Sequence, residues 1–178
     1  TTFINIFGGP GAGKSTNAAR LFSEMKVGGY SVELVTEVAK DFVWEERNKT
    51  MEIQPYITMK QYRNLYRMKG KVDYVITDAP LMMGIVYAKK YASDLPDSYY
   101  DLVWELQDKF LSPSINVVLT REHAYETVGR NQTKEQAEEL DKYLVKILDG
   151  YGIDYDVMGG EFTKSHVLQV LKGNKHGR

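Results

Sequence analysis

The sequence of 178 residues contains no cysteine, so disulfide bonds and cysteine-ligated metal sites are excluded. It also has no segment close to the roughly 18 consecutive apolar residues that a membrane-spanning helix needs. The formal net charge is only −1, so no overall positive field draws the protein to nucleic acid or anionic lipid. Any polyanion must therefore be bound by a local patch, and we expect a cytoplasmic protein.

The amino-acid composition is that of a globular enzyme, with 43% hydrophobic and 26% charged residues. This length predicts one domain over residues 1–178, with a basic tail at 172–178. The first apolar run, residues 3–7, leads directly into a glycine-rich loop, which we interpret as leaving no room for a signal peptide.

Short β-rich runs alternate with helical patterns along the chain, which predicts an α/β fold with a parallel sheet covered by helices. The predicted strands are residues 3–7, 32–36, 74–77, 115–119 and 155–158. The predicted helices cover residues 13–26, 38–47, 56–68, 82–92, 98–111 and 163–171, with one more that begins at a capping box at Thr133.

The loop after the first strand matches the phosphate-binding pattern G-x-x-x-x-G-K-[ST] in full, between a predicted strand and a predicted helix. Glycines let successive N–H groups turn inward toward phosphate oxygens, and the helix N-terminus adds partial positive charge. We expect Lys14 to reach the β- and γ-phosphates of ATP, Ser15 to bind Mg²⁺ and Thr16 to contact the α-phosphate. The predicted nucleotide-binding residues are Gly9, Pro10, Gly11, Ala12, Gly13, Lys14, Ser15 and Thr16.

Two acidic residues end the second and third strands. Asp78, after the third strand, has the Walker B position and is predicted to hold Mg²⁺ or to act as the base. Glu37 follows the second strand, and ligands of open parallel sheets bind at the carboxyl ends of strands. One carboxylate can serve the metal while the other accepts the proton of an attacking hydroxyl, and the sequence leaves open which does which.

A polar segment, residues 121–133, separates the fourth strand from the next helix and is predicted to form a lid. It carries Arg121 and Arg130, and an arginine placed on the transferring phosphoryl group accelerates transfer by about 10³–10⁵. Both arginines are therefore candidate catalytic residues.

The segment between the second and third strands holds the candidate acceptor contacts. Arg63 and Arg67, together with Lys60, have helical spacing next to an aromatic stripe, a combination that suits a nucleic-acid backbone with an unstacked base. A solvated basic face beside a core stripe is the alternative. Asp41 and Trp44 in the preceding helix are further candidates.

The stretches GGPGAGKST, VELVTEVAKDFVWE, KVDYVITDAPL and GRNQTKEQAEELD resemble small P-loop kinases of the nucleoside and nucleotide kinase group. The likeness extends to phage-type P-loop kinases of the AAA class that are related to nicotinamide riboside kinase. It implies a three-layer αβα P-loop NTPase fold with a five-stranded parallel sheet of order 2-3-1-4-5. It also implies ATP and Mg²⁺ as cofactors and phosphate transfer to a hydroxyl of a nucleoside-like acceptor.

Some phage relatives phosphorylate 5-hydroxymethyluracil in DNA, so the resemblance implies this base in phage DNA as the most specific acceptor, and the host cytoplasm as the location. A free nucleoside or nucleotide is the alternative. The Asp-Arg pair of thymidylate kinases is missing, because Ala79 and Pro80 follow Asp78. That difference argues against a simple monophosphate kinase.

Two other classes share the phosphate loop. A GTPase needs an Asn-Lys-x-Asp element after a strand, whereas residues 120–123 read Thr-Arg-Glu-His. A P-loop ATPase without acceptor phosphorylation remains the second hypothesis. The sequence indicates neither membrane attachment nor an obligate protein partner.

Overall fold

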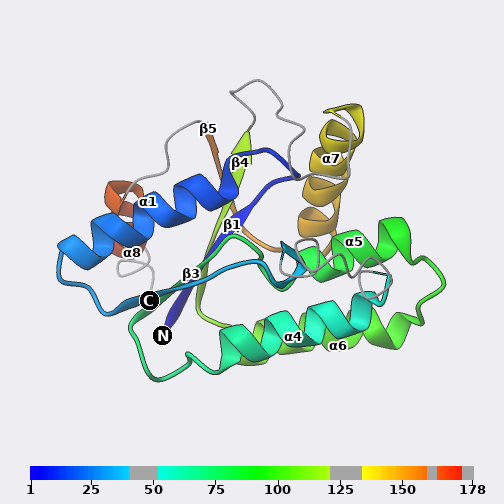
Figure 1. Cartoon of the computed structure of the whole chain (residues 1–178), viewed down its shortest axis with the longest axis horizontal. Coiled ribbons are helices and arrows are strands. Elements are labelled where there is room, and N and C mark those ends of the chain that lie inside the picture. The colour runs from blue at the N-terminus through cyan, green and yellow to red at the C-terminus, as the bar shows by residue number, and fades with distance from the viewer. Residues whose placement is uncertain (41–51, 121–133, 160–163, 174–178) are drawn as a thin grey trace.

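A single five-stranded parallel sheet organises the part of the chain that the structure describes. The structure is a computed structural model and describes residues 1–40, 52–120, 134–159 and 164–173. The strands are β1 (Thr2–Phe7), β2 (Val32–Val35), β3 (Tyr74–Thr77), β4 (Ser114–Thr120) and β5 (Asp156–Gly159). Their order is β2-β3-β1-β4-β5, and every neighbouring pair is parallel, which confirms the predicted fold class and strand order (Figure 1).

Helices cover both faces of the sheet (Figure 1). Helices α1 (Lys14–Val27) and α8 (Lys164–Gly173) lie on one face. The other face carries α4 (Gln54–Tyr66), α5 (Met83–Tyr91), α6 (Asp97–Phe110) and α7 (Lys134–Gly150). The predicted helix over 38–47 is described only for residues 38–40, which are helical.

The alternation of side chains along the strands builds two hydrophobic cores. In β1, Phe3 and Phe7 pack under α5, α6 and α7, while Ile4 and Ile6 face α1 and α8. All four are at most 1% exposed. Strands that are buried on both faces have nearly continuous apolar sequences, so this strand could be predicted from its sequence.

A polar link crosses the middle of the sheet. Asn5 is 2% exposed, and its side-chain amide donates to Oδ1 of Asn116 in β4 at 2.8 Å. The Asn116 amide in turn donates to the Asp154 carbonyl oxygen at 3.0 Å, just before β5. The two asparagines stand opposite each other in the β1–β4 register, so the link joins the three strands at one level.

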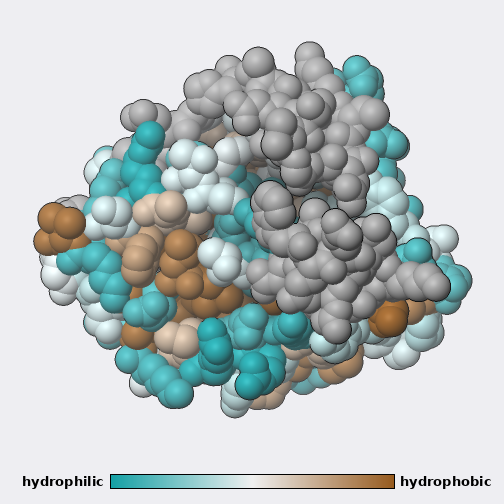
Figure 2. Space-filling view, in the orientation of Figure 1, coloured by the Kyte–Doolittle hydropathy of each residue, from teal (hydrophilic) through white to brown (hydrophobic). Residues whose placement is uncertain are grey.

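The surface is mixed in character. In the view of Figure 2, one apolar area lies over α1 and the edge strand β2. Phe22 of α1 and Leu34 of β2 are partly buried and pack against the core on that side. The rest of this face is largely hydrophilic where it is coloured.

Parallel strands place their carboxyl ends on one edge of the sheet. The loop of residues 8–13 follows β1 directly, Asp78 follows β3 directly and Glu37 comes two residues after β2, so all three lie at that edge. The opposite edge is closed by contacts of Thr1, whose hydroxyl donates to the Val72 carbonyl at 2.6 Å and accepts from the Gly70 amide at 2.8 Å.

A close approach of α4 and α5 gives the first prediction. A Cβ added at Gly84 of α5 would lie 2.7 Å from Cγ2 and 3.1 Å from Cβ of Thr58, and closer still to its hydroxyl oxygen. Thr58 is 2% exposed, and its hydroxyl is bonded to the Tyr99 hydroxyl at 2.8 Å, so it has little freedom to move. Gly84→Ala should lower the free energy of unfolding by about 1–3 kcal/mol, measured by urea denaturation.

Gly150→Ala is the matched control, because a Cβ at Gly150 meets nothing within 4 Å. That variant should be neutral or slightly stabilising, since alanine has the higher helix propensity. Equal stability of the Gly84 variant and the unsubstituted protein would contradict the packing argument.

Candidate functional site

The loop after β1 has the backbone geometry that a phosphate cradle needs. Gly8, Gly11 and Gly13 have φ values of +148°, +82° and +85°, which side-chain-bearing residues rarely adopt. A Cβ at Gly8 would lie only 2.8 Å from Cβ of Ala12. Gly13 in the left-handed region then leads into α1, which begins at Lys14. The loop therefore has the tight turns of a phosphate-binding loop and lies at the positive end of a helix.

The Lys14 side chain reaches back to the start of this loop. Its Nζ donates to the Gly9 carbonyl oxygen at 3.1 Å. Burial lowers the pKa of the Lys14 amine, while the carboxylates of Glu37, Asp78 and Asp141 act in the opposite direction. Three acidic groups are thus close enough to raise the pKa of the Lys14 amine, and the Lys40 ammonium lowers it.

A buried carboxylate at the end of β3 forms the acidic side of the site. Asp78 is 1% exposed, and its Oδ2 accepts from the Ser15 hydroxyl at 2.6 Å. The Lys40 ammonium contacts the same Ser15 hydroxyl and lies 3.2 Å from Asp78 Oδ2. Oδ1 of Asp78 has no hydrogen-bond partner among the described residues.

These contacts fit a magnesium ion. The Lys40 ammonium already places a positive charge against both predicted metal ligands, and Asp78 Oδ1 is an unused buried acceptor. No group of three or more histidine, cysteine or acidic residues suited to a metal occurs in the described ranges. Mg²⁺ is commonly held by one or two carboxylates together with substrate phosphates.

Glu37 follows β2 on the neighbouring side of the same centre. Glu37 is partly buried. Among the charged groups it has the largest effect on the pKa of the Lys14 amine, which it raises. Lys40 follows three residues after Glu37, so this short segment brings a carboxylate and an ammonium group to the site together. The sequence singled out Glu37 but not Lys40, whose place depends on the turn into the helix after β2.

Asp141 of α7 is a second residue that the sequence did not single out. Its Oδ1 accepts a hydrogen bond from the Gly9 amide at 2.5 Å across 132 positions of the chain. A motif search could not find it, because nothing local marks one acid among several in α7. Only the packing of α7 on the sheet brings it to the loop.

Gln61 of α4 lies beside the segment that follows Glu37. Its Oε1 accepts from the Val38 amide at 3.1 Å, and the residue is 5% exposed. Its Nε2 is buried without a hydrogen-bond partner in the part of the chain that the structure describes. Gln61 is therefore an available donor next to the predicted base.

Arg63 and Arg67 are exposed and belong to the end of α4 that leads away from the loop. Gly70, three residues after Arg67, contacts Thr1 at the opposite edge of the sheet. The aromatic stripe beside them belongs partly to the core, since Met59 and Tyr62 pack against it and Tyr66 stacks on Tyr62. The structure thus does not bring Arg67 to the phosphate loop.

Four predicted site residues lie outside the described residues. They are Asp41, Trp44, Arg121 and Arg130, and the predicted lid at 121–133 lies outside with them.

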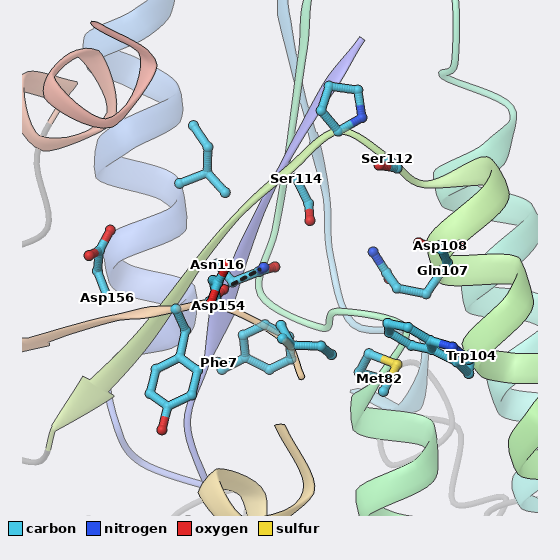
Figure 3. Close-up of a pocket in the computed structure, with 14 residues that line it drawn as sticks. Phe7, Met82, Trp104, Gln107, Asp108, Ser112, Ser114, Asn116, Asp154 and Asp156 are labelled. Atoms are coloured by element: carbon cyan, nitrogen blue, oxygen red, sulfur yellow. Dashed lines mark hydrogen bonds between the residues drawn. The ribbon is translucent and has the colours of Figure 1, made fainter. Parts of the chain in front are cut away.

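A cavity of about 510 Å³ lies elsewhere, between α6 and the first residues of β4 and β5 (Figure 3). Its lining includes Trp104, Gln107, Asp108, Ser114, Asn116 and Asp156, and Figure 3 shows the Gln107 side chain directed from α6 toward β4. None of the loop residues 8–16 lines it, and neither does Glu37 or Asp78. The cavity is therefore separate from the phosphate loop.

Comparison with known proteins places this architecture in a family. A family model described as an AAA domain matches residues 3–163, so the chain belongs to that AAA domain family, a class of P-loop proteins. No curated protein matches the chain.

Solved structures of deoxyadenosine kinase from M. mycoides share the fold. The structure with bound dATP is 20% identical, covers 98% of this chain and 100% of its own, and has a TM-score of 0.55. The structure with the product dCMP and a flexible dCDP is 17% identical, covers 99% and 100%, and has a TM-score of 0.54. The structure with dCTP is 18% identical with the same coverage and a TM-score of 0.51.

No helix in the described ranges is long and apolar enough to cross a membrane.

The contact of Lys40 with Ser15 and Asp78 generates a prediction about metal affinity. A half-exposed ion pair contributes up to about 1 kcal/mol, which is about fivefold in an equilibrium constant. Lys40→Met should therefore lower the Mg²⁺ concentration for half-maximal ATP binding by about that factor, measured by calorimetric titration at several Mg²⁺ concentrations.

Lys26→Met is the control, since Lys26 makes an exposed ion pair with Glu33 at 3.1 Å instead. It should leave the Mg²⁺ dependence unchanged. A higher Mg²⁺ requirement in the Lys40 variant would contradict competition between the ammonium and the metal.

Proposed function

We propose that the protein is an ATP-dependent kinase that transfers the γ-phosphate to a hydroxyl group of a nucleoside-like acceptor. The observation that carries this proposal is the contact of the buried Asp78 carboxylate with Ser15 at the start of α1. It joins a metal-binding pair to a phosphate loop at the carboxyl edge of the sheet. P-loop phosphotransferases use this combination to bind ATP with Mg²⁺.

The triphosphate binds along the loop from Gly9 to Thr16. The backbone amides and the Lys14 ammonium stabilise negative charge on the β- and γ-phosphates, and Thr16 contacts the α-phosphate. Ser15 and Asp78 hold Mg²⁺, which supplies further neutralisation of phosphate charge when bound.

Glu37 is the general base in this proposal. Asp78 Oδ2 is already engaged by Ser15 and Lys40, whereas Glu37 is partly exposed at the neighbouring strand end. The acceptor oxygen forms a bond to the γ-phosphorus while the bond from that phosphorus to the ADP oxygen breaks. The hydroxyl proton passes to the Glu37 carboxylate.

Arg121 and Arg130 are proposed to stabilise the charge of the transferring phosphoryl group. Asp41 and Trp44 are proposed to contact the acceptor, as the sequence predicts. Gln61 joins them, because its buried Nε2 is a hydrogen-bond donor beside Glu37 and can pair with a polar edge of the acceptor.

A free deoxynucleoside or nucleotide is the acceptor that the fold favours. The deoxyadenosine kinase structures contain dATP, dCTP or dCMP, and their chains are covered in full by the likeness to this one. A hydroxymethylated base in phage DNA is the narrower alternative. Arg63 and Arg67 are the residues on which it rests, and both are exposed on the part of α4 that leads away from the loop.

The direct test is incubation with γ-labelled ATP, Mg²⁺ and a panel of deoxynucleosides, deoxynucleotides and hydroxymethylated DNA. Label should move to an acceptor hydroxyl, and Lys14→Ala should lower the rate by at least about 10²-fold while circular dichroism shows an unchanged fold. Full activity in that variant would refute the role of the loop.

The same assay separates the alternatives. Label released only as inorganic phosphate, with or without acceptor, would indicate an ATPase. A polymeric acceptor should show binding that weakens steeply between low and moderate salt, whereas a free nucleoside should show little salt dependence.

The two carboxylates are distinguished by comparing turnover with nucleotide affinity. Glu37→Gln should lower kcat by at least about 10²-fold with little change in ATP affinity, because it removes only proton acceptance. Asp78→Asn should weaken Mg²⁺-dependent ATP binding as well. The reverse pattern would exchange the two roles.

A further inference from the structure

Asp141 is directed at the part of the loop where the terminal phosphate of a nucleotide is expected. Its carboxylate accepts from the Gly9 amide at 2.5 Å, and Lys14 Nζ lies on the Gly9 carbonyl at 3.1 Å. Since a P-loop lysine reaches the β- and γ-phosphates, Gly9 marks the end of the loop that serves the terminal phosphate. Asp141 also contributes to the charge around Lys14.

We propose that the Asp141 carboxylate is an internal substitute for the γ-phosphate and that it sets the preference of the site between ATP and ADP. This inference rests on the proposed function, because it assumes that the loop binds nucleoside phosphates.

The physical basis is competition for the same donors. A carboxylate and a phosphate both accept charge-assisted hydrogen bonds from backbone amides, so the Gly9 amide serves one of them at a time. A γ-phosphate that takes this amide displaces Asp141 and also brings like charges close together, which raises the cost of ATP binding. ADP ends at the β-phosphate and leaves the contact between Asp141 and Gly9 intact.

Phosphoryl transfer then has a built-in compensation. Once the γ-phosphate has left on the acceptor, the Asp141 carboxylate returns to the Gly9 amide, which would otherwise lose its hydrogen bond. Asp141 is a specificity-determining residue in this scheme, because it acts on nucleotide preference and takes no proton.

The test measures the dissociation constants of ADP and of the non-hydrolysable analogue β,γ-imido-ATP, by calorimetry with Mg²⁺ and without acceptor. Asp141→Ala should tighten binding of the triphosphate analogue by about tenfold, which corresponds to about 1.4 kcal/mol, and leave ADP within about twofold. Asp141→Asn, which keeps a neutral acceptor at the same place, should give an intermediate result. Melting by circular dichroism checks that both variants are folded.

Glu138→Ala is the matched control. Glu138 lies one turn earlier on α7, is exposed, carries the same charge and is not among the groups that act on Lys14. Its removal should leave the ratio of the two dissociation constants unchanged.

Three outcomes overturn the inference. Equal tightening for both nucleotides would indicate a general charge effect. Two unchanged dissociation constants would show that Asp141 and the γ-phosphate do not compete. Weaker triphosphate binding would make Asp141 a ligand of the nucleotide or its metal. All three leave the loop as a nucleotide site. Failure of the unsubstituted protein to bind either nucleotide would instead refute the proposed function itself.

Discussion

A buried carboxylate needs compensation, and the arrangement around Asp78 follows from that need. The side chain is 1% exposed at the tip of β3 and meets the Ser15 hydroxyl and the Lys40 ammonium. An isolated ionised carboxylate at this depth would cost several kcal/mol, so these partners belong to the stability of the fold as well as to its chemistry. The contact ties β3, the start of α1 and the segment after β2 to one point.

The site is an arrangement of alternating charges on a fixed backbone. Lys14 lies among Glu37, Asp78 and Asp141, and Lys40 lies against Asp78. The positive-φ glycines hold the loop open toward these groups without any side chain of their own. Because these charged groups come from α1, α7, the end of β3 and the segment after β2, the electrostatics of the centre depends on how the helices and strands are packed.

The sequence predicted the sheet well, since buried parallel strands are short apolar runs whose ends are marked by glycine or acidic residues. The strand at 74–77 was placed correctly to the residue, and the fold likeness supplied the strand order. The loop motif and the acids Glu37 and Asp78 could be singled out because they lie at or near the ends of strands, and their functional roles remain predictions. Lys40, Gln61 and Asp141 were missed because their roles arise from contacts between distant elements, with 23 positions between Gln61 and Val38 and 132 between Asp141 and Gly9.

Arg67 illustrates the limit of helical spacing. The pattern correctly gave a helix with basic residues on its surface, but spacing contains no information on which end of a helix faces the site. After Arg67 the short connection to β3 returns the chain to the starting edge of the sheet, where the Gly70 amide donates to the Thr1 hydroxyl, and a contact of Arg67 with an acceptor stays a prediction.

The amide link from Asn5 through Asn116 to the Asp154 carbonyl has a consequence for strand alignment. If β1 slipped by one residue against β4, the Asn5 side chain would turn to the other face of the sheet and lose its partner while still buried. Misaligned pairings are therefore penalised inside the sheet, three residues before the glycine loop begins. Together with the backbone pairing of β1 and β4, these two side-chain amides fix the level at which the chain leaves β1 to form the glycine turn.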